Sequence, residues 1–286
     1  MTLIDHLHTD RRADMTTTLA AAPVFDIEAV LASIDTMATR KPVAAQIVSV
    51  ANADGTSAKE LSAAVACDVP LAGRVLKLAN SAYFGMRGRV TSLQFAVTVV
   101  GFTTVRTMAT VALTDLDDES RLPADFWDVS TNLALAAAGL APRFGERPQD
   151  ALCIGLLAQL GVALLHHNDP GGYAELSARH PAAAARRTAE VRNYGIHALR
   201  LTSVALEQWG FPHSMVLPLR EVDDLDAPEG GLLRTAFELA GRLCAAGHEN
   251  VPVPVLSGGR VAERDLAPVL ESVRAEAEEL RRALLG

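Results

Sequence analysis

The spacing of apolar residues constrains the fold of this chain more than any other feature. From Asp26 onward, apolar side chains recur every three or four residues with few breaks, which is the period of an amphipathic helix. The alternation typical of a half-buried strand is nearly absent. Aromatic residues make up only 5% of the chain, so Ala, Leu and Val have to form most of the core. The sequence therefore predicts an all-α fold.

Polar breaks divide this helical pattern into four parts. Residues 1–22 show no clear periodicity and predict a flexible N-terminal arm. Residues 23–114 predict a first helical bundle, which ends before an acidic, proline-terminated linker at 115–123. A second helical bundle is expected over residues 120–228, and a C-terminal helical extension over residues 229–286.

Between Asp68 and Gly101 the chain carries its most specific run of cap and turn residues. The Asp68 carboxylate is suited to cap the helix that follows it. Asn80 and Ser81 favour local backbone hydrogen bonds over continuing that helix, and Gly85 permits a tight turn after them. Gly101 ends or kinks the next helix. We interpret Asn80 and Ser81 as a hydrogen-bonded helix end that orders the first bundle, rather than as a ligand contact.

This run resembles the HDOD family, the HD-related output domain of bacterial signalling proteins. The family has an Asn-Ser-Ala element, an aromatic-Gly turn and a helix ending in glycine, and the corresponding residues here are Asp68, Asn80, Ser81, Tyr83, Phe84, Gly85 and Gly101. The Val69-Pro70 step departs from the expected Asp-Pro turn, but either order places proline in a first helical turn. The resemblance covers roughly residues 25–225, and it implies an N-terminal helical bundle followed by a degenerate HD-type bundle.

The helix predicted from Asp150 to His166 lacks the residues by which HD-superfamily phosphohydrolases hold their metals. The resemblance places a His-Asp pair on this helix and a His two residues after a tryptophan, where this chain has Ala158, Gln159 and Val129. A methyl group and a neutral amide cannot replace an imidazole and a carboxylate as metal ligands. His197 lies close to the register of a later family histidine, but one histidine does not make a site. We therefore expect no metal, no cofactor and no catalysis.

These losses favour a non-catalytic bacterial signalling module that works through protein–protein contact, in a pathway that the resemblance links to cyclic dinucleotides. Two alternatives stay open because residues 40–110 carry eight Lys or Arg against three Asp or Glu, within a chain of net charge −8. Residues 57–90 also look like a helix-turn-helix that would present four basic residues to DNA: Arg74, Lys77, Arg87 and Arg89. The same cations would suit the phosphates of a cyclic dinucleotide, which makes the chain a nucleotide receptor. Metal-dependent hydrolysis is the least favoured function.

The C-terminal helix carries a narrow apolar seam, with apolar residues at 266, 270, 273, 277, 280 and 284. We expect this helix to pack against its own domain, and a homodimer through residues 266–284 is the alternative. The apolar run from Ala151 to Leu165 contains Gln159 and is too short to span a bilayer, so no membrane contact is expected. The three cysteines form no CxxC pair, which predicts reduced thiols in a cytoplasmic protein.

Overall fold

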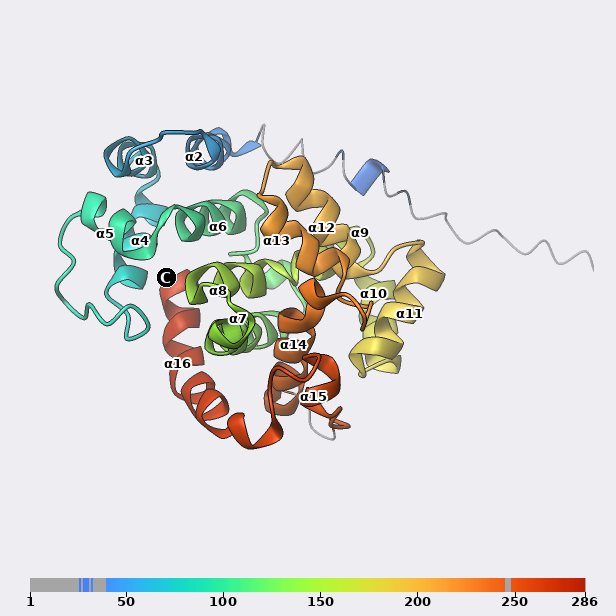
Figure 1. Ribbon diagram of the computed structural model, residues 1–286. Helices are drawn as coiled ribbons and strands as arrows, with labels where there is room; N and C mark the ends of the chain where they lie inside the picture. The colour runs from blue at the N-terminus through green and yellow to red at the C-terminus, as the bar shows by residue number, and fades with distance from the viewer. Residues whose placement is uncertain (1–25, 27, 31, 33–39, 245–247, 286) are drawn as a thin grey trace, which may run out of the picture.

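The structure is a computed structural model that describes residues 26, 28–30, 32, 40–244 and 248–285. Over these residues the chain consists of helices and connecting turns, without a strand (Figure 1). The predicted all-α fold is therefore confirmed. The arm predicted over residues 1–22 lies outside the described residues.

The first bundle occupies the upper left of Figure 1, and its helices are α2 (Pro42–Asn52), α3 (Ala58–Val65), α4 (Val69–Ala79), α5 (Leu93–Val100) and α6 (Phe102–Leu113). Ser57 caps α3 through a reciprocal capping box with Glu60. Asp68 caps α4 by accepting a hydrogen bond from the Leu71 amide at 2.9 Å, as predicted. Helices α5 and α6 meet at an angle of 103°. Gly101 makes this corner with a φ of 81°, a backbone conformation that glycine adopts without strain.

The second bundle follows a linker that contains a 3₁₀ turn, η1 (Glu119–Arg121), and its helices are α7 (Phe126–Phe144), α8 (Pro148–Leu157), α9 (Leu160–Asn168), α10 (Pro170–Arg179), α11 (Ala183–Tyr194), α12 (Ala198–Gln208) and α13 (His213–Arg220). Helices α7 and α8 form an antiparallel hairpin, with Gly145 in a left-handed conformation at its turn. They pack so closely that a Cβ on Gly155 would lie 2.5 Å from the Cα of Ala134. Small side chains in the core allow the two helix backbones to approach this closely.

The helix predicted from Asp150 to His166 is broken in the structure. Helices α8 and α9 are separated by Ala158 and Gln159. The hydroxyl of Thr202 on α12 accepts a hydrogen bond from the Gly161 amide at 2.8 Å and lies 3.2 Å from the Ala158 carbonyl oxygen. It thus serves two backbone groups that would otherwise need partners within a continuous helix. The break therefore comes from a tertiary contact with α12.

The C-terminal extension consists of η2 (Pro228–Gly230), α14 (Gly231–Cys244), α15 (Val253–Leu256), η3 (Glu263–Asp265) and α16 (Ala267–Leu285). Helices α14 and α16 lie beside α7, and α16 also reaches α4 of the first bundle (Figure 1). The apolar seam of α16 is turned inward, with Val273, Leu280 and Leu284 almost fully buried. The helix thus packs against its own chain, so a homodimer through residues 266–284 would have to use its exposed face.

Helices α8 and α9 form the apolar centre of the molecule. Together they span Pro148–Asn168, a stretch with a mean hydropathy of 1.5 that is long and apolar enough to cross a membrane by length and composition alone. This corrects the prediction that the run is too short. However, 78% of the 18-residue window that passes this test is buried inside the protein, as in the core helices of globular proteins. The pair α5 and α6 passes the same test only as a span broken by its 103° bend.

Candidate functional site

Asn80 closes the end of α4 through hydrogen bonds to a segment ten residues further along the chain. Its side-chain amide donates to the carbonyl oxygens of Leu76 (3.1 Å) and Val90 (2.8 Å), and its side-chain oxygen accepts from the Val90 amide (3.0 Å). Val90 is buried, so these bonds satisfy backbone groups that water cannot reach. The prediction that Asn80 forms a hydrogen-bonded helix end is confirmed.

The residues after Asn80 fill the loop between α4 and α5. The rings of Tyr83 and Phe84 meet edge to face with centroids 4.9 Å apart, and burial raises the pKa of the Tyr83 phenol well above its usual range. Gly85 has a φ of 66° and makes the expected turn. The Ser81 hydroxyl is buried without a hydrogen-bond partner, which corrects the expectation that it bonds to local backbone. In the structure these residues pack the loop and form its turns, and Asn80 makes most of its hydrogen bonds.

The three positions that correspond to metal ligands in HD enzymes lie at the same end of the α7–α8 hairpin. Helices α7 and α8 are antiparallel and touch at Gly155, so Val129 on α7 and Ala158–Gln159 after α8 are brought toward each other. Ala158 is fully buried and Gln159 is 5% exposed. Helix α12 packs against the start of α9, just after these positions, because a Cβ on Gly161 would lie 1.9 Å from the carbonyl oxygen of Ala198 on α12. Ala158 and Gln159 are therefore enclosed by packing, whereas Val129 is partly exposed.

A hollow beside α9, which none of these three positions lines, is small. It has a volume of about 20 Å³ and is lined in part by Leu160, Leu164 and His167. A space of this size holds about one water molecule, whereas drug-sized ligands use pockets of about 300 to 1,000 Å³. The described residues also contain no group of three or more His, Cys, Asp or Glu that could hold a metal ion.

His197, the histidine near the register of a family ligand, is engaged in holding its own helix. Its Nδ1 accepts a hydrogen bond from the Arg200 amide at 3.3 Å and so caps α12. Its Nε2 lies 3.3 Å from the carboxylate of Asp223, which also pairs with Arg187 at 2.7 Å. Burial lowers the pKa of His197, and this effect outweighs the nearby Asp223 carboxylate, which raises it. Both ring nitrogens are occupied, so the side chain offers no free position for a metal.

We expect a His197→Asn variant to lose less stability than the wild type when the pH falls from about 7.5 to about 5.5. The pKa of His197 lies below the ordinary value of 6.5 in the folded chain, so the unfolded chain takes up the proton first and folding weakens as the pH falls below that value. Asparagine keeps the cap but does not titrate. Urea unfolding at both pH values measures the difference. The exposed His213→Asn variant is the control and should follow the wild type; equal losses in all three proteins would contradict this assignment.

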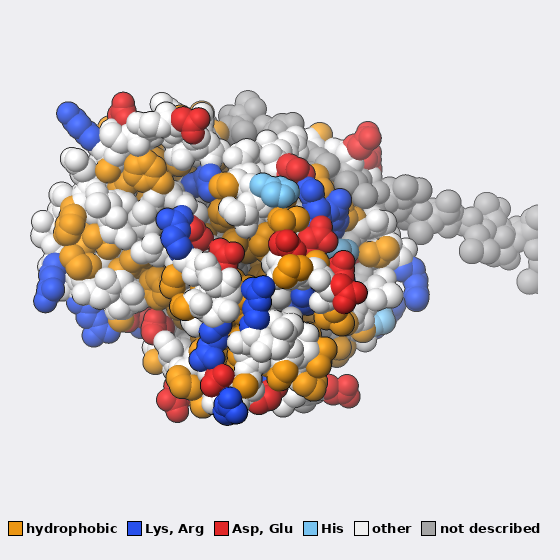
Figure 2. All heavy atoms as spheres, in the orientation of Figure 1, with side chains coloured by type: hydrophobic (Ala, Val, Ile, Leu, Met, Phe, Trp, Pro, Cys, Tyr) orange, Lys and Arg blue, Asp and Glu red, His pale blue; other side chains and the backbone are white. Residues whose placement is uncertain are grey.

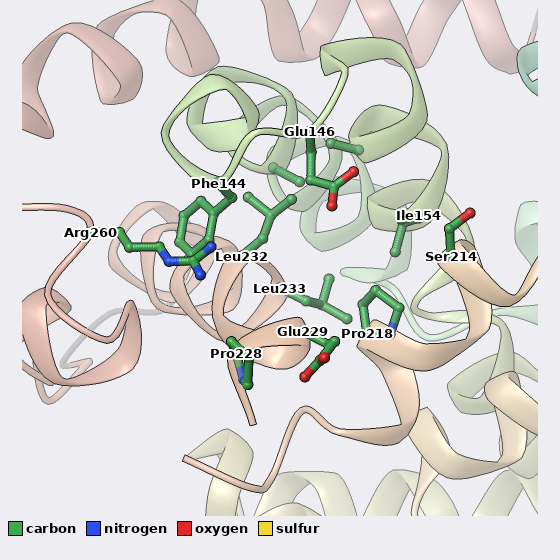
Figure 3. A pocket seen from close by; sticks show the side chains of 12 residues that line it. Phe144, Glu146, Ile154, Ser214, Pro218, Pro228, Glu229, Leu232, Leu233 and Arg260 are labelled. Carbon is green, nitrogen blue, oxygen red and sulfur yellow. The ribbon is translucent and has the colours of Figure 1, made fainter. Parts of the chain in front are cut away.

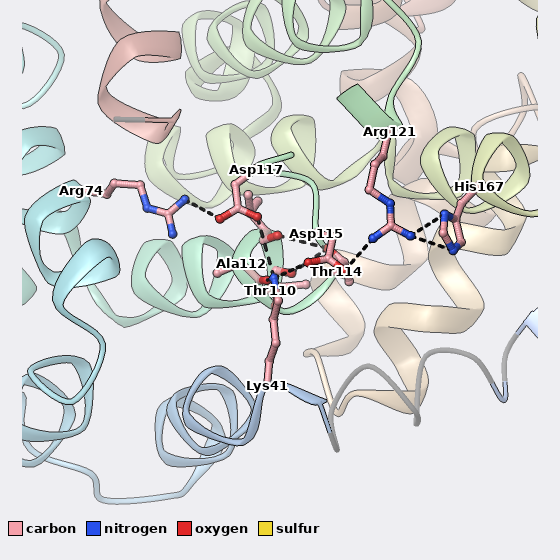
Figure 4. Close-up of polar contacts among 10 residues, drawn as sticks. Lys41, Arg74, Thr110, Ala112, Thr114, Asp115, Asp117, Arg121 and His167 are labelled. Atoms are coloured by element: carbon pink, nitrogen blue, oxygen red, sulfur yellow. Dashed lines mark hydrogen bonds and ion pairs between the residues drawn. The ribbon is translucent and has the colours of Figure 1, made fainter. Parts of the chain in front are cut away.

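A chain of ion pairs pins the start of the linker between the two bundles (Figure 4). Lys41, which precedes α2, pairs with Asp115 at 2.5 Å and with Asp117 at 3.9 Å. Arg74 on α4 pairs with Asp117 at 3.0 Å. Asp115 has a left-handed backbone conformation with a φ of 56°, which costs a non-glycine residue about 1 kcal/mol. The ion pairs hold that turn in place.

The network continues from the linker to the second bundle (Figure 4). Arg121 pairs with Asp115 at 3.2 Å, and its other guanidinium nitrogen lies 3.0 Å from Nδ1 of His167 on α9. Partial burial and the Arg121 cation lower the pKa of His167, which favours a neutral ring that accepts the hydrogen bond. The linker is thus tied to α2, α4 and α9. Sequence reasoning missed this network because its members come from four separate segments.

The predicted basic surface is only partly present. Arg74 is 9% exposed and paired with Asp117, so it does not face a DNA groove, which corrects that prediction. Lys77, Arg87 and Arg89 are exposed, and Arg87 pairs with Glu279 of α16 at 3.4 Å. On the face shown in Figure 2, basic and acidic side chains are interspersed rather than gathered by sign. The helix-turn-helix interpretation therefore loses the residue at the centre of its recognition helix.

A second cation, Arg106, is buried where the two bundles meet. Its guanidinium donates to Oδ1 of Asn52 on α2 at 2.5 Å and lies over the ring of Phe211 at 4.2 Å from the centroid. Another of its nitrogens lies 3.4 Å from the sulfur of Met215 on α13. Burial lowers the pKa of this arginine. In the sequence, this residue is a single arginine within the mainly apolar stretch 102–113, and a lone arginine does not by itself predict a buried cation.

Comparisons with known proteins agree with this geometry. A family model for the HDOD domain matches residues 37–225. Among solved structures, a proposed phosphohydrolase from Shewanella amazonensis is 23% identical, with 90% of this chain and 98% of that chain covered and a TM-score of 0.67. An HDOD domain protein of unknown function from Geobacter sulfurreducens is 18% identical, with 91% of this chain and 98% of that chain covered and a TM-score of 0.61.

A proposed signal transduction protein from Marinobacter aquaeolei is also 18% identical, with 93% of this chain and 68% of that chain covered and a TM-score of 0.65. No curated protein sequence matches the chain. At these identities the likeness to solved structures establishes the fold and leaves activity to be argued from the residues.

Proposed function

The chain belongs to the HDOD family, and we propose that it is a non-catalytic regulatory module that acts by contact with another protein. The observation that carries this proposal is the content of the end of the α7–α8 hairpin. Val129, Ala158 and Gln159 stand where HD enzymes hold metals, and α12 packs against the backbone at Ala158 and Gly161. A site that lacks the metal-ligating side chains retains the scaffold but not the chemistry.

The proposed setting is the bacterial cytoplasm, in a signalling pathway linked to cyclic dinucleotides. Family membership supports a regulatory role, since the HDOD domain is the HD-related output domain of signalling proteins. A structural relative described as a proposed signal transduction protein is consistent with that role, whereas another relative is described as a proposed phosphohydrolase. The residues at the degenerate positions favour the first description for this chain.

The two binding alternatives have weaker support. A DNA-binding regulator would need the α3–α4 segment to present its cations, and Arg74 is buried in an ion pair. A cyclic-dinucleotide receptor would need free cations at a pocket, whereas the pocket beside Lys41 and Arg74 contains their partner Asp117. We therefore place both below the protein-contact function.

We expect purified protein, expressed with added Mn, Fe or Zn, to carry substoichiometric metal and to show no turnover of bis(p-nitrophenyl) phosphate or cyclic dinucleotides. The physical reason is the absence of metal-ligating side chains at the three HD positions. Metal analysis by mass spectrometry and a phosphodiesterase assay test this, with an HD phosphodiesterase as positive control. Stoichiometric metal together with turnover would overturn the proposed function.

A further inference from the structure

A hollow opens at the end of the α7–α8 hairpin opposite to the degenerate metal positions (Figure 3). It has a volume of about 210 Å³ and lies between this hairpin, α13, η2 and the start of α14. Its walls include Phe144, Ile154, Pro218, Leu232 and Leu233. The hollow is therefore a second feature of this bundle, distinct from the site where HD enzymes hold metals.

The size and chemistry of the hollow suit one large side chain. Drug-sized ligands occupy pockets of about 300 to 1,000 Å³, which is larger than this space. Energetically dominant residues at protein interfaces are instead single large side chains that fill small, well-packed pockets. The walls are mainly apolar, and the hydroxyl of Ser214, on the exposed first turn of α13, lies at the edge.

The rim of the hollow is mainly acidic. Glu146 and Glu229 are exposed at opposite edges in Figure 3, and neither forms an ion pair with any residue that the structure describes. The one cation at the rim, Arg260, lies over the ring of Phe144 at 5.5 Å from its centroid. Residues 221–229, which lead into the wall at Pro228, contain five acidic and no basic residues, of which Asp223 pairs with Arg187. A partner that reaches this rim meets a negative field.

Arg234 holds this acidic segment in place through hydrogen bonds to its backbone rather than to its carboxylates. It is 7% exposed, and its guanidinium donates to the backbone carbonyl oxygens of Glu221 (3.0 Å) and Ala227 (2.8 Å). It also donates to the carbonyl oxygen of Leu256 at 3.2 Å. Because backbone oxygens take these bonds, the carboxylate of Glu229 stays available to a partner. A rim ordered in advance costs less entropy on binding.

We propose that this hollow is the docking site for the protein partner, and that it receives a large apolar side chain flanked by Lys or Arg. The inference rests on the proposed function and adds the chemistry of the partner to it. The apolar side chain contributes affinity through burial in the hollow. The flanking cations pair with the rim carboxylates and set specificity and association rate.

Three capped heptapeptides test the proposal on the full chain: Lys-Arg-Gly-Phe-Gly-Arg-Lys, the same peptide with Ala in place of Phe, and Glu-Asp-Gly-Phe-Gly-Asp-Glu. Fluorescence anisotropy should show saturable, salt-sensitive binding of the first peptide. The Ala peptide should bind at least about tenfold more weakly, and the acidic peptide should not bind. Equal binding of the first two peptides, or none, would overturn the proposal.

Two variants locate the binding. Ser214→Trp fills the edge of the hollow and should lower the affinity for the first peptide about tenfold or more. Ala63→Trp on the exposed face of α3 should leave that affinity unchanged. The Glu146→Lys/Glu229→Lys double variant should lower the affinity for the first peptide by a similar factor. Its control is Asp54→Lys/Glu249→Lys, which reverses the same number of exposed charges elsewhere.

Unchanged binding in both hollow variants would contradict the docking site. The metal and phosphodiesterase assays do not depend on this hollow. A failure of the docking proposal is therefore distinguishable from a failure of the proposed function.

Discussion

Replacement of Gly161 by alanine is expected to destabilise the protein by about 3 kcal/mol or more. A Cβ at this position would lie 1.9 Å from the carbonyl oxygen of Ala198 and 3.0 Å from its Cα. These atoms belong to the backbone of α12, so no side-chain rotation can relieve the overlap. Helices α9 and α12 would have to separate, which also stretches the hydrogen bond between the Gly161 amide and Thr202.

Gly73→Ala is the matched control. Gly73 lies inside α4, and a Cβ there meets no atom within 4 Å. Alanine stabilises a helix interior by up to about 1 kcal/mol relative to glycine, so this variant should be as stable as the wild type or more stable. Urea unfolding of both variants gives the two free energies. If Gly161→Ala were as stable as Gly73→Ala, α9 and α12 would not pack as closely as the structure shows, and the proposed enclosure of Ala158 by α12 would be wrong.

The sequence predicted the elements that depend on neighbouring residues. The cap at Asp68, the turn at Gly85 and the corner at Gly101 follow from local hydrogen bonding and backbone freedom, and the structure contains all three. The family resemblance predicted the residues at the degenerate positions from short, consecutive helices, and the structure places Val129 on α7 and Ala158 and Gln159 between α8 and α9.

Features that depend on distant residues could not be predicted in this way. The break after α8 depends on Thr202, which lies 44 residues beyond Ala158. Arg74 looked like a surface cation on its own helix, and only the position of Asp117 explains its burial. The cation that contacts both bundles, Arg106, finds its partners 54 residues before it and 109 residues after it. Periodicity and caps contain no information about such pairings.

Replacement of Asn80 by alanine is expected to cost about 2 to 3 kcal/mol of unfolding free energy. The change removes both hydrogen bonds to Val90, whose amide and carbonyl are buried and would then lack partners. The Leu76 carbonyl still accepts a hydrogen bond from the backbone amide of residue 80 at 3.2 Å, so loss of its bond to the side chain adds little to the cost. The loop from Ser81 to Val90 would lose its anchor at the end of α4.

The control variant is Asn132→Ala, because the Asn132 amide donates only to the carbonyl of Asp128 one turn earlier in α7. Such a local, solvent-accessible bond is worth about 0.5 kcal/mol or less, so this variant should stay close to the wild type. The comparison decides whether Asn80, the most specific residue of the motif, has a structural role or contacts a ligand. A structural Asn80 lowers the unfolding free energy and leaves the affinity for the basic Phe peptide unchanged, because the hollow lies in the other bundle. If Asn80→Ala kept its stability but lost that affinity, Asn80 would be a ligand contact, and our interpretation of the motif would be wrong.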